Sequence, residues 1–123
     1  MASSPPFTLR LFEPDIGSEE RQAVLQVLDS GMLSMGAMVE AFEDAFARFL
    51  GIRHAIAVSS ATAALHLAHH VMGIGAEDEV IVPSLTFVAT ANSVIYTGAT
   101  PVFAEITGAQ DLNIDPDDVA HRI

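Results

Sequence analysis

The feature that most constrains the fold is a long segment, from Val80 to Ala104, that contains no charged residue. A segment of this length and polarity must be buried, either in a protein core or in a membrane. One continuous membrane helix is disfavoured because Pro83 and Pro101 lack a backbone N–H and Gly98 interrupts helical periodicity. The segment divides more naturally into a buried strand, a buried helix and a second buried strand. It therefore predicts an α/β core and no membrane span.

Apolar spacing and capping residues predict the elements around this segment. We expect an extended arm over residues 1–17, two helices and a connecting loop over 18–50, and alternating strands and helices over 54–123. The predicted helices cover residues 18–30, 38–50, 60–72, 86–97 and 116 to the end, and the predicted strands cover 54–58, 79–82 and 100–106. Ser18 and Asp115 are the predicted N-caps of the first and last helices. This alternation is typical of a single α/β domain, expected here over residues 1–123.

The charge and composition exclude several classes of partner. The net charge is −11, so the chain has no basic surface with which to neutralise nucleic-acid phosphates or an anionic membrane. It has no cysteine and therefore no disulfide framework. The first residues lack an apolar run after a basic region, so we expect no secretory signal and a cytoplasmic protein. Half of the residues are apolar and the mean hydropathy is +0.40, so part of the surface is expected to lie against a partner.

A small, hydroxylated turn joins the strand predicted at 54–58 to the next helix. It consists of Ser60, Ala61 and Thr62. The first backbone N–H groups of a helix have no partner within the helix, and together with a hydroxyl donor they form a site for an anion such as phosphate. The alternative is that Ser60 and Thr62 merely cap the helix.

An aromatic residue, Phe87, follows the next predicted strand. Its ring could cover a flat heterocycle, or it could be an ordinary core residue. Ligands of parallel sheets collect outside the carboxyl ends of the strands, and both Thr62 and Phe87 follow such ends. We therefore expect the two loops to share one crevice, and together they indicate a phosphorylated aromatic cofactor.

Three histidines lie close together on the helix predicted at 60–72. His66, His69 and His70 have the three- and four-residue spacing that can bring two imidazoles to one metal ion. The chain supplies no carboxylate or cysteine at a recognisable metal-binding spacing from them. We therefore predict solvated or capped histidines and no metal site.

The strongest signal is a set of four motifs that occur in order along the chain. They are SGMLSMG at 30–36, SATAALHLAH at 60–69, EDEVIVPSLTFVATANSV at 77–94 and GATPVFAEI at 98–106. Together they resemble the DegT/DnrJ/EryC1/StrS family of pyridoxal-phosphate-dependent sugar aminotransferases. One departure stands out, because Ala61 occupies a position where that family usually has glycine.

The resemblance carries specific implications. The fold would be the amino-terminal part of the large domain of a type I, aspartate aminotransferase-like enzyme, with a mostly parallel sheet and flanking helices. Pyridoxal 5'-phosphate (PLP) would be held by Ser60, Ala61 and Thr62 at its phosphate and by Phe87 at its ring. The substrates would be a nucleotide-linked keto sugar and an amino-acid donor, glutamate by analogy. The site would be completed in a homodimer, with Ser34, Met35 and Gly36 near the sugar.

The chain contains no lysine, and its basic residues are all arginines. Enzymes of this class hold PLP as a Schiff base on a lysine, which also moves protons during transamination. We therefore expect these 123 residues to be an inactive amino-terminal portion of a longer enzyme. Two alternatives remain open. The full protein could be a sugar dehydratase of the same family, or the chain could be a lysine-free binding or assembly module.

Overall fold

The computed structural model describes residues 12–123, which form two compact units that meet in sequence at Ala57 and Val58. Part of the arm predicted over residues 1–17 lies outside the described residues, and 12–17 form neither helix nor strand. Within the described part of the chain, no helix is both long enough and apolar enough to cross a membrane.

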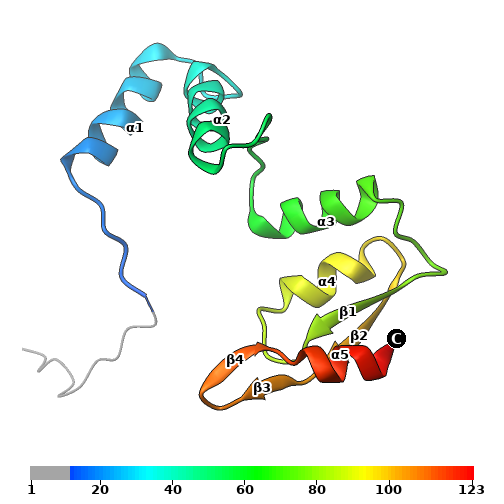
Figure 1. Ribbon diagram of the computed structural model, residues 1–123. Helices are drawn as coiled ribbons and strands as arrows, with labels where there is room; N and C mark the ends of the chain where they lie inside the picture. The colour runs from blue at the N-terminus through cyan, green and yellow to red at the C-terminus, as the bar shows by residue number, and fades with distance from the viewer. Residues whose placement is uncertain (1–11) are drawn as a thin grey trace, which may run out of the picture. The chain divides into compact units, whose positions relative to one another are not determined.

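The first unit contains two helices, α1 (Ser18–Ser30) and α2 (Ala37–Leu50), joined by a short loop (Figure 1). The N-cap of α1 is Gly17, so the prediction of Ser18 was wrong by one residue. The reason is that the Glu20 carboxylate reaches back and accepts a hydrogen bond of 2.7 Å from the Gly17 N–H. Each helix ends at a glycine in the left-handed conformation, which a residue with a Cβ adopts only at a cost.

The second unit alternates helices and strands, as the sequence predicted. Its elements are α3 (Ala61–Val71), β1 (Glu79–Pro83), α4 (Ala89–Ile95), β2 (Thr100–Ala104), β3 (Ile106–Gly108), β4 (Asp111–Ile114) and α5 (Pro116–Arg122). Strands β1 and β2 pair in parallel, with Ile81 opposite Val102. A parallel pair needs a crossover connection, and α4 provides it. The chain therefore has the expected α/β fold, with a parallel sheet and flanking helices.

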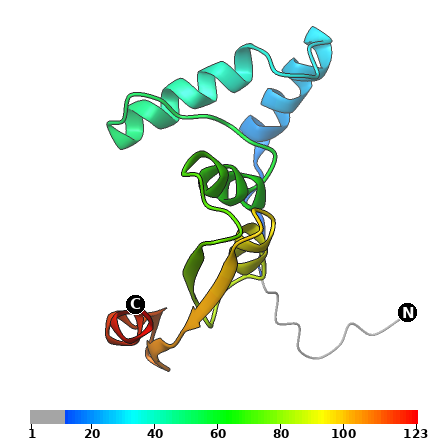
Figure 2. The same cartoon turned by 90° about the vertical axis from the view of Figure 1, so that its right-hand side faces the viewer.

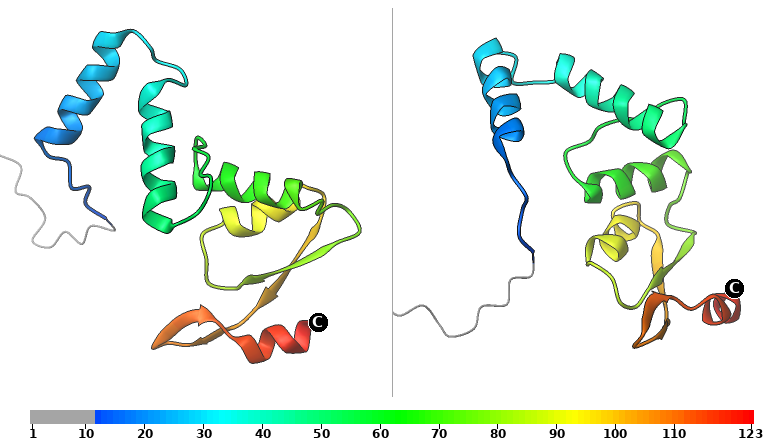
Figure 3. Two further views of the ribbon diagram at one scale, coloured as in Figure 1. Left: turned by 45° about the horizontal axis from the view of Figure 1, so that its top comes forward. Right: turned by 60° about the vertical axis from the view of Figure 1, so that its left-hand side comes forward.

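The core of this unit lies between α4 and the parallel sheet. Val82, Val94 and Ala99 form a buried cluster, with Ile74 and Val80 packed against it. Both strands are short and uncharged beyond Glu79, as burial on a sheet face requires. Helix α4 lies between α3 and the sheet (Figures 1 and 3). The uncharged segment thus forms the strand, helix and strand that the positions of Pro83, Gly98 and Pro101 predicted.

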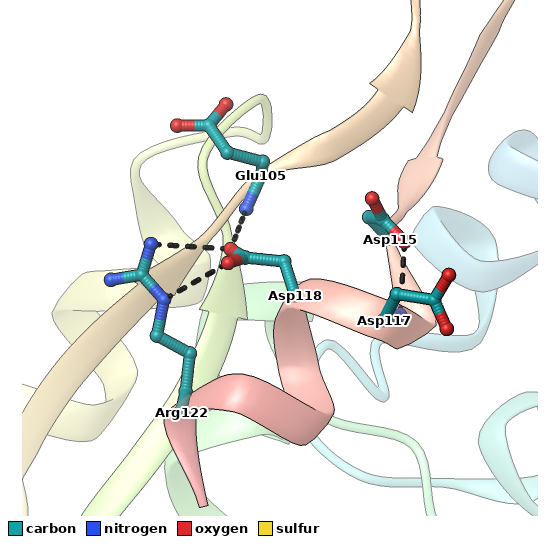
Figure 4. A network of polar contacts seen from close by, with 5 residues as sticks. All are labelled: Glu105, Asp115, Asp117, Asp118 and Arg122. Carbon is teal, nitrogen blue, oxygen red and sulfur yellow. Dashed lines mark hydrogen bonds and ion pairs between the residues drawn. The ribbon is translucent and has the colours of Figure 1, made fainter.

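A hairpin and a short helix follow β2. Strands β3 and β4 pair antiparallel, and with α5 they lie at the end of the unit away from α3 (Figure 2). Helix α5 is capped by Asp115, as predicted, whose carboxylate accepts from the Asp117 N–H at 2.9 Å. Asp118 joins α5 to the residue after β2, because its carboxylate accepts a hydrogen bond of 2.7 Å from the Glu105 N–H (Figure 4). Within α5, the same carboxylate pairs with Arg122 at 3.2 Å.

Some predicted elements differ from the structure. Residues 54–58 do not form a strand, because no strand among residues 12–123 lies beside them to pair with their backbone groups. The strand expected over 100–106 is interrupted at Glu105, whose N–H bonds to Asp118 instead of to a neighbouring strand. The β3–β4 hairpin was not predicted. The helix expected from Thr86 begins at Ala89, and the one expected from Ser60 begins at Ala61.

Candidate functional site

The turn at Ser60 begins α3 and presents unpaired backbone donors. Ser60 is the N-cap, and its Oγ accepts a hydrogen bond of 3.1 Å from the Ala63 N–H. Its hydroxyl proton is still available to donate, since a hydroxyl has one donor and two acceptor sites. Within the described residues, the N–H groups of Ala61 and Thr62 and the Thr62 hydroxyl have no hydrogen-bond partner. Capping and anion binding are therefore compatible at this turn.

The first turn of α3 is also free of acidic residues. Helices α1, α2 and α5 each carry one or two carboxylates in their first turn, whereas α3 and α4 carry none. A carboxylate there would compete with an anion for the positive end of the helix dipole. In a chain with a net charge of −11, an acid-free helix start leaves this position open to an anionic ligand.

Alanine at position 61 causes no backbone strain. None of the non-glycine residues among 12–123 has a positive φ, and Ala61 is the first residue of α3. The backbone conformation therefore does not require the glycine that the family usually has here. Compared with glycine, Ala61 adds only a methyl group near the unpartnered N–H groups of Ala61 and Thr62.

Phe87 lies in the loop between β1 and α4, and 76% of its surface is exposed. Within residues 12–123 it is therefore not part of the buried core, and its role as a stacking surface stays a prediction. No other aromatic ring in the described part of the chain is in contact with it. An exposed ring at the end of a strand is free to contact a planar ligand.

The starts of α3 and α4 lie at the same end of the unit. Figures 1 and 3 show both helices beginning on the side where β1 ends. The helices are also in contact, because the rings of His66 and Tyr96 meet edge to face with centroids 5.5 Å apart. At about 1.5 Å per residue, His66 lies about 7.5 Å along its helix from Ala61, and Tyr96 lies about 10.5 Å along from Ala89. The two helix starts are therefore at similar levels.

The loop before α2 belongs to the first unit. Ser34 and Gly36 line a cavity of about 640 Å³ between the end of α1 and the start of α2, together with apolar residues that include Met32 and Leu33. Met35 does not line it and is 80% exposed. The position of this loop relative to the turn at Ser60 stays a prediction.

The three histidines have separate environments. His66 packs against Tyr96, and His70 is exposed. The Nδ1 atom of His69 is buried and has no hydrogen-bond partner among the described residues. No group of three potential metal ligands is found in residues 12–123.

One pair of residues near Phe87 had not been assigned a role from the sequence. The hydroxyls of Thr86 and Thr90 are hydrogen-bonded at 2.8 Å, one on each side of the aromatic residue. The signal for this pair was present in the sequence, as two threonines four residues apart around the start of a helix. Threonine hydroxyls often form such local bonds at helix starts.

The donors at the start of α3 fit the phosphate of PLP, and the exposed Phe87 ring fits its pyridine ring. Ala61 and Thr62 offer two backbone N–H groups and one hydroxyl, which are the donors that a phosphate dianion needs. These donors and this ring therefore match the two ends of the cofactor in their chemistry.

Comparisons with known proteins show which family the chain resembles. The model of the DegT/DnrJ/EryC1/StrS aminotransferase family, whose members depend on PLP, matches residues 14–123. The spore coat polysaccharide biosynthesis protein SpsC of Bacillus subtilis (strain 168) is 57% identical over 103 residues, which cover 84% of this chain and 26% of SpsC. GDP-perosamine synthase of Vibrio cholerae is 44% identical, over 92% of this chain and 31% of its own length.

Solved structures lead to the same family. DesV of S. venezuelae is 42% identical and superposes with a TM-score of 0.79, over 86% of this chain and 28% of DesV. The chain thus spans between a quarter and a third of the length of these relatives. Its α/β fold is the one found in PLP-dependent aminotransferases. On the match from residue 14 to residue 123, the chain belongs to the DegT/DnrJ/EryC1/StrS aminotransferase family.

Proposed function

We propose that this chain forms the part of a sugar aminotransferase that binds the phosphate and covers the ring of PLP. The N–H groups of Ala61 and Thr62 and the Thr62 hydroxyl bind the phosphate, with the Ser60 hydroxyl as a further donor. Phe87 covers one face of the pyridine ring and shields it from water. The observation that carries this proposal is the acid-free start of α3, with its unpartnered donors, at the same end of the unit as the Phe87 loop.

The substrate we propose is a keto sugar linked to a nucleotide, with glutamate as the amino donor. Relatives with sugar-related names support this class, among them GDP-perosamine synthase. Bound PLP supplies an electron sink that makes the transfer of an amino group possible. The loop with Ser34, Met35 and Gly36 is proposed to lie near the sugar, with Ser34 as the hydrogen-bonding side chain.

We also propose that activity requires residues outside this chain. The chain has no lysine, so the amine that holds PLP and moves protons must come from elsewhere in a longer polypeptide. The 123 residues alone are expected to be inactive. A homodimer of the full-length protein is proposed as the working assembly, by analogy with the family. The cytoplasmic location stays a prediction.

The phosphate site is tested by Thr62→Val in the full-length protein. Valine has nearly the shape of threonine but removes the hydroxyl donor, so PLP should be lost more readily during dialysis, with Kd raised about tenfold. The matched control is Thr100→Val. Thr100 lies at the amino end of β2, away from the carboxyl ends where the cofactor is placed, and this variant should retain PLP normally.

Two results would count against the proposal. If the unaltered full-length protein binds no PLP, the cofactor assignment fails. If that protein binds PLP and Thr62→Val retains it equally well, Thr62 is not part of the phosphate site. The substrate class is tested separately, by supplying nucleotide-linked keto sugars with glutamate and measuring the formation of 2-oxoglutarate.

A further inference from the structure

The loop that carries Phe87 is held on both sides of the aromatic residue. The Thr86 and Thr90 hydroxyls are hydrogen-bonded at 2.8 Å, and the Thr90 N–H donates to the Phe87 carbonyl oxygen at 3.0 Å. Thr90 thus contacts both Phe87 and the residue before it. These two bonds close a small ring of chain around the position from which the aromatic side chain projects.

Thr90 is itself fixed to the core. It lies in the first turn of α4 and is half-buried, and its carbonyl oxygen accepts a hydrogen bond of 2.9 Å from Ser93 Oγ. Ser93 and its neighbour Val94 are both fully buried, so α4 is firmly seated at this point. The exposed loop is therefore tied to a buried element through both the side chain and the backbone of Thr90.

An exposed aromatic side chain on a loose loop would lose conformational freedom when it stacks on a ligand. That loss reduces affinity, and a loop already held in its bound conformation avoids most of it. The Thr86–Thr90 bond supplies such a restraint on the segment that carries Phe87. Its effect on the cofactor is indirect, because neither hydroxyl is needed to touch the pyridine ring.

We propose that Thr90 is a positioning residue which, through its hydroxyl bond to Thr86, holds Phe87 in place over the pyridine ring of PLP. The inference rests on the proposed function. It goes further in assigning a role to a residue outside the set proposed to contact the cofactor.

The test is Thr90→Val in the full-length protein, with PLP as the probe. The variant removes one hydroxyl and keeps the shape of the side chain. We expect the Kd for PLP to rise about two- to tenfold, the range of one neutral hydrogen bond. The circular dichroism of bound PLP in its visible absorption band should also weaken, because that signal reports how firmly the ring is held. Thr90→Ser retains the hydroxyl, so its Kd for PLP and its dichroism should be close to those of the unaltered protein.

A second variant separates positioning from general stability. Thr86→Val removes the same bond from an exposed residue, so it should fold normally and reproduce the effect of Thr90→Val. If the two hydroxyls act as one unit, the double variant should be no worse than either single variant.

The matched control is Thr97→Val. The Thr97 hydroxyl also makes a hydrogen bond of 2.8 Å, to the Val94 carbonyl oxygen, at the opposite end of the same helix. Loss of this bond should lower the stability of α4 about as much as Thr90→Val does, but leave the dichroism and the Kd for PLP unchanged.

Three results discriminate among the claims. If the unaltered protein binds no PLP, the proposed function fails together with this inference. If it binds PLP and the variants at positions 86 and 90 show unchanged Kd and dichroism, the positioning role is overturned and the proposed function stands. If Thr97→Val weakens the dichroism as much as Thr90→Val does, the effect belongs to helix stability, which also overturns the inference.

Discussion

The rings of His66 and Tyr96 meet edge to face at 5.5 Å, and this contact joins the helix that begins at the proposed phosphate site to the helix that follows the Phe87 loop. The interplanar angle is 70°, which places the edge of one ring against the face of the other. The separation of the two ends of the proposed cofactor site therefore depends partly on one aromatic pair.

Replacing Tyr96 by leucine should lower the free energy of unfolding by about 1 kcal/mol, which is typical of an aromatic pair. Urea unfolding of the full-length protein measures this loss. Tyr96→Phe is the control, because it keeps the ring and removes a hydroxyl for which no hydrogen bond is found in the described part of the chain. Equal destabilisation by both variants would show that the ring contact contributes little.

The carboxylate of Asp118 should make stability depend on pH. The Glu105 N–H and the Arg122 guanidinium both bind its ionised form and so lower its pKa. A lowered pKa means that the carboxylate stabilises the folded state above its ordinary pKa, about 4. That contribution is lost as the pH falls from there through the lowered value.

This pH dependence is measured by comparing the melting temperatures of the full-length protein and Asp118→Asn between neutral and acidic pH. The variant should be less stable near pH 7 and lose less stability on acidification. The control is Asp117→Asn, which removes a charge from the same first turn but leaves the bond to Glu105 intact (Figure 4). If the acid-induced loss were the same in all three proteins, Asp118 would not be responsible for it.

Replacing the glycine that ends α2 by alanine should lower the stability of the protein. Gly51 has a φ of 68°, and a Cβ there would meet no atom within 4 Å, so any cost comes from the backbone alone. Gly51→Ala should therefore destabilise the protein by about 1 kcal/mol. Gly75→Ala is the control, because its φ is not positive and its Cβ would make an ordinary contact at 3.9 Å. In denaturant unfolding, the free energy of unfolding of Gly75→Ala should lie within about 0.5 kcal/mol of that of the unaltered protein, or above it.

The loop proposed to lie near the sugar can be tested through Gly36. A Cβ at this position would lie 2.8 Å from Met32 Cγ, so alanine would displace the methionine and reshape the cavity that both residues line. We expect Gly36→Ala to raise KM for the sugar several-fold while PLP retention is unchanged. Adding Met32→Ala removes the clashing atom and should reverse part of the increase. An unchanged KM in Gly36→Ala would exclude this loop from the sugar site.

The sequence predicted the elements whose signals are local. Gly31 and Gly51 marked the ends of α1 and α2 because a left-handed residue is needed there, and Asp115 with Pro116 marked the start of α5. The uncharged segment predicted the parallel pair β1–β2 and its crossover helix. In these cases the residues of each segment were sufficient to predict its structure.

Other features depend on partners that the local sequence does not specify. Residues 54–58 have the composition of a strand, but a strand forms only beside another, and none lies there among residues 12–123. The β3–β4 hairpin was missed because its turn, at Ala109 and Gln110, lacks the residues that usually mark a hairpin. At the proposed site, the sequence alone suggested the turn at Ser60 and the loop at Phe87, whereas the role proposed for Thr90 depends on a hydrogen bond that only coordinates reveal.

The parallel pair β1–β2 and its crossover helix α4 come from one uninterrupted stretch of chain. During synthesis, this stretch can close into its native arrangement once Ala104 has left the ribosome, without waiting for later segments to emerge. Such early closure would bury much of the longest uncharged stretch of residues 1–123 while translation continues, and so protect it from aggregation.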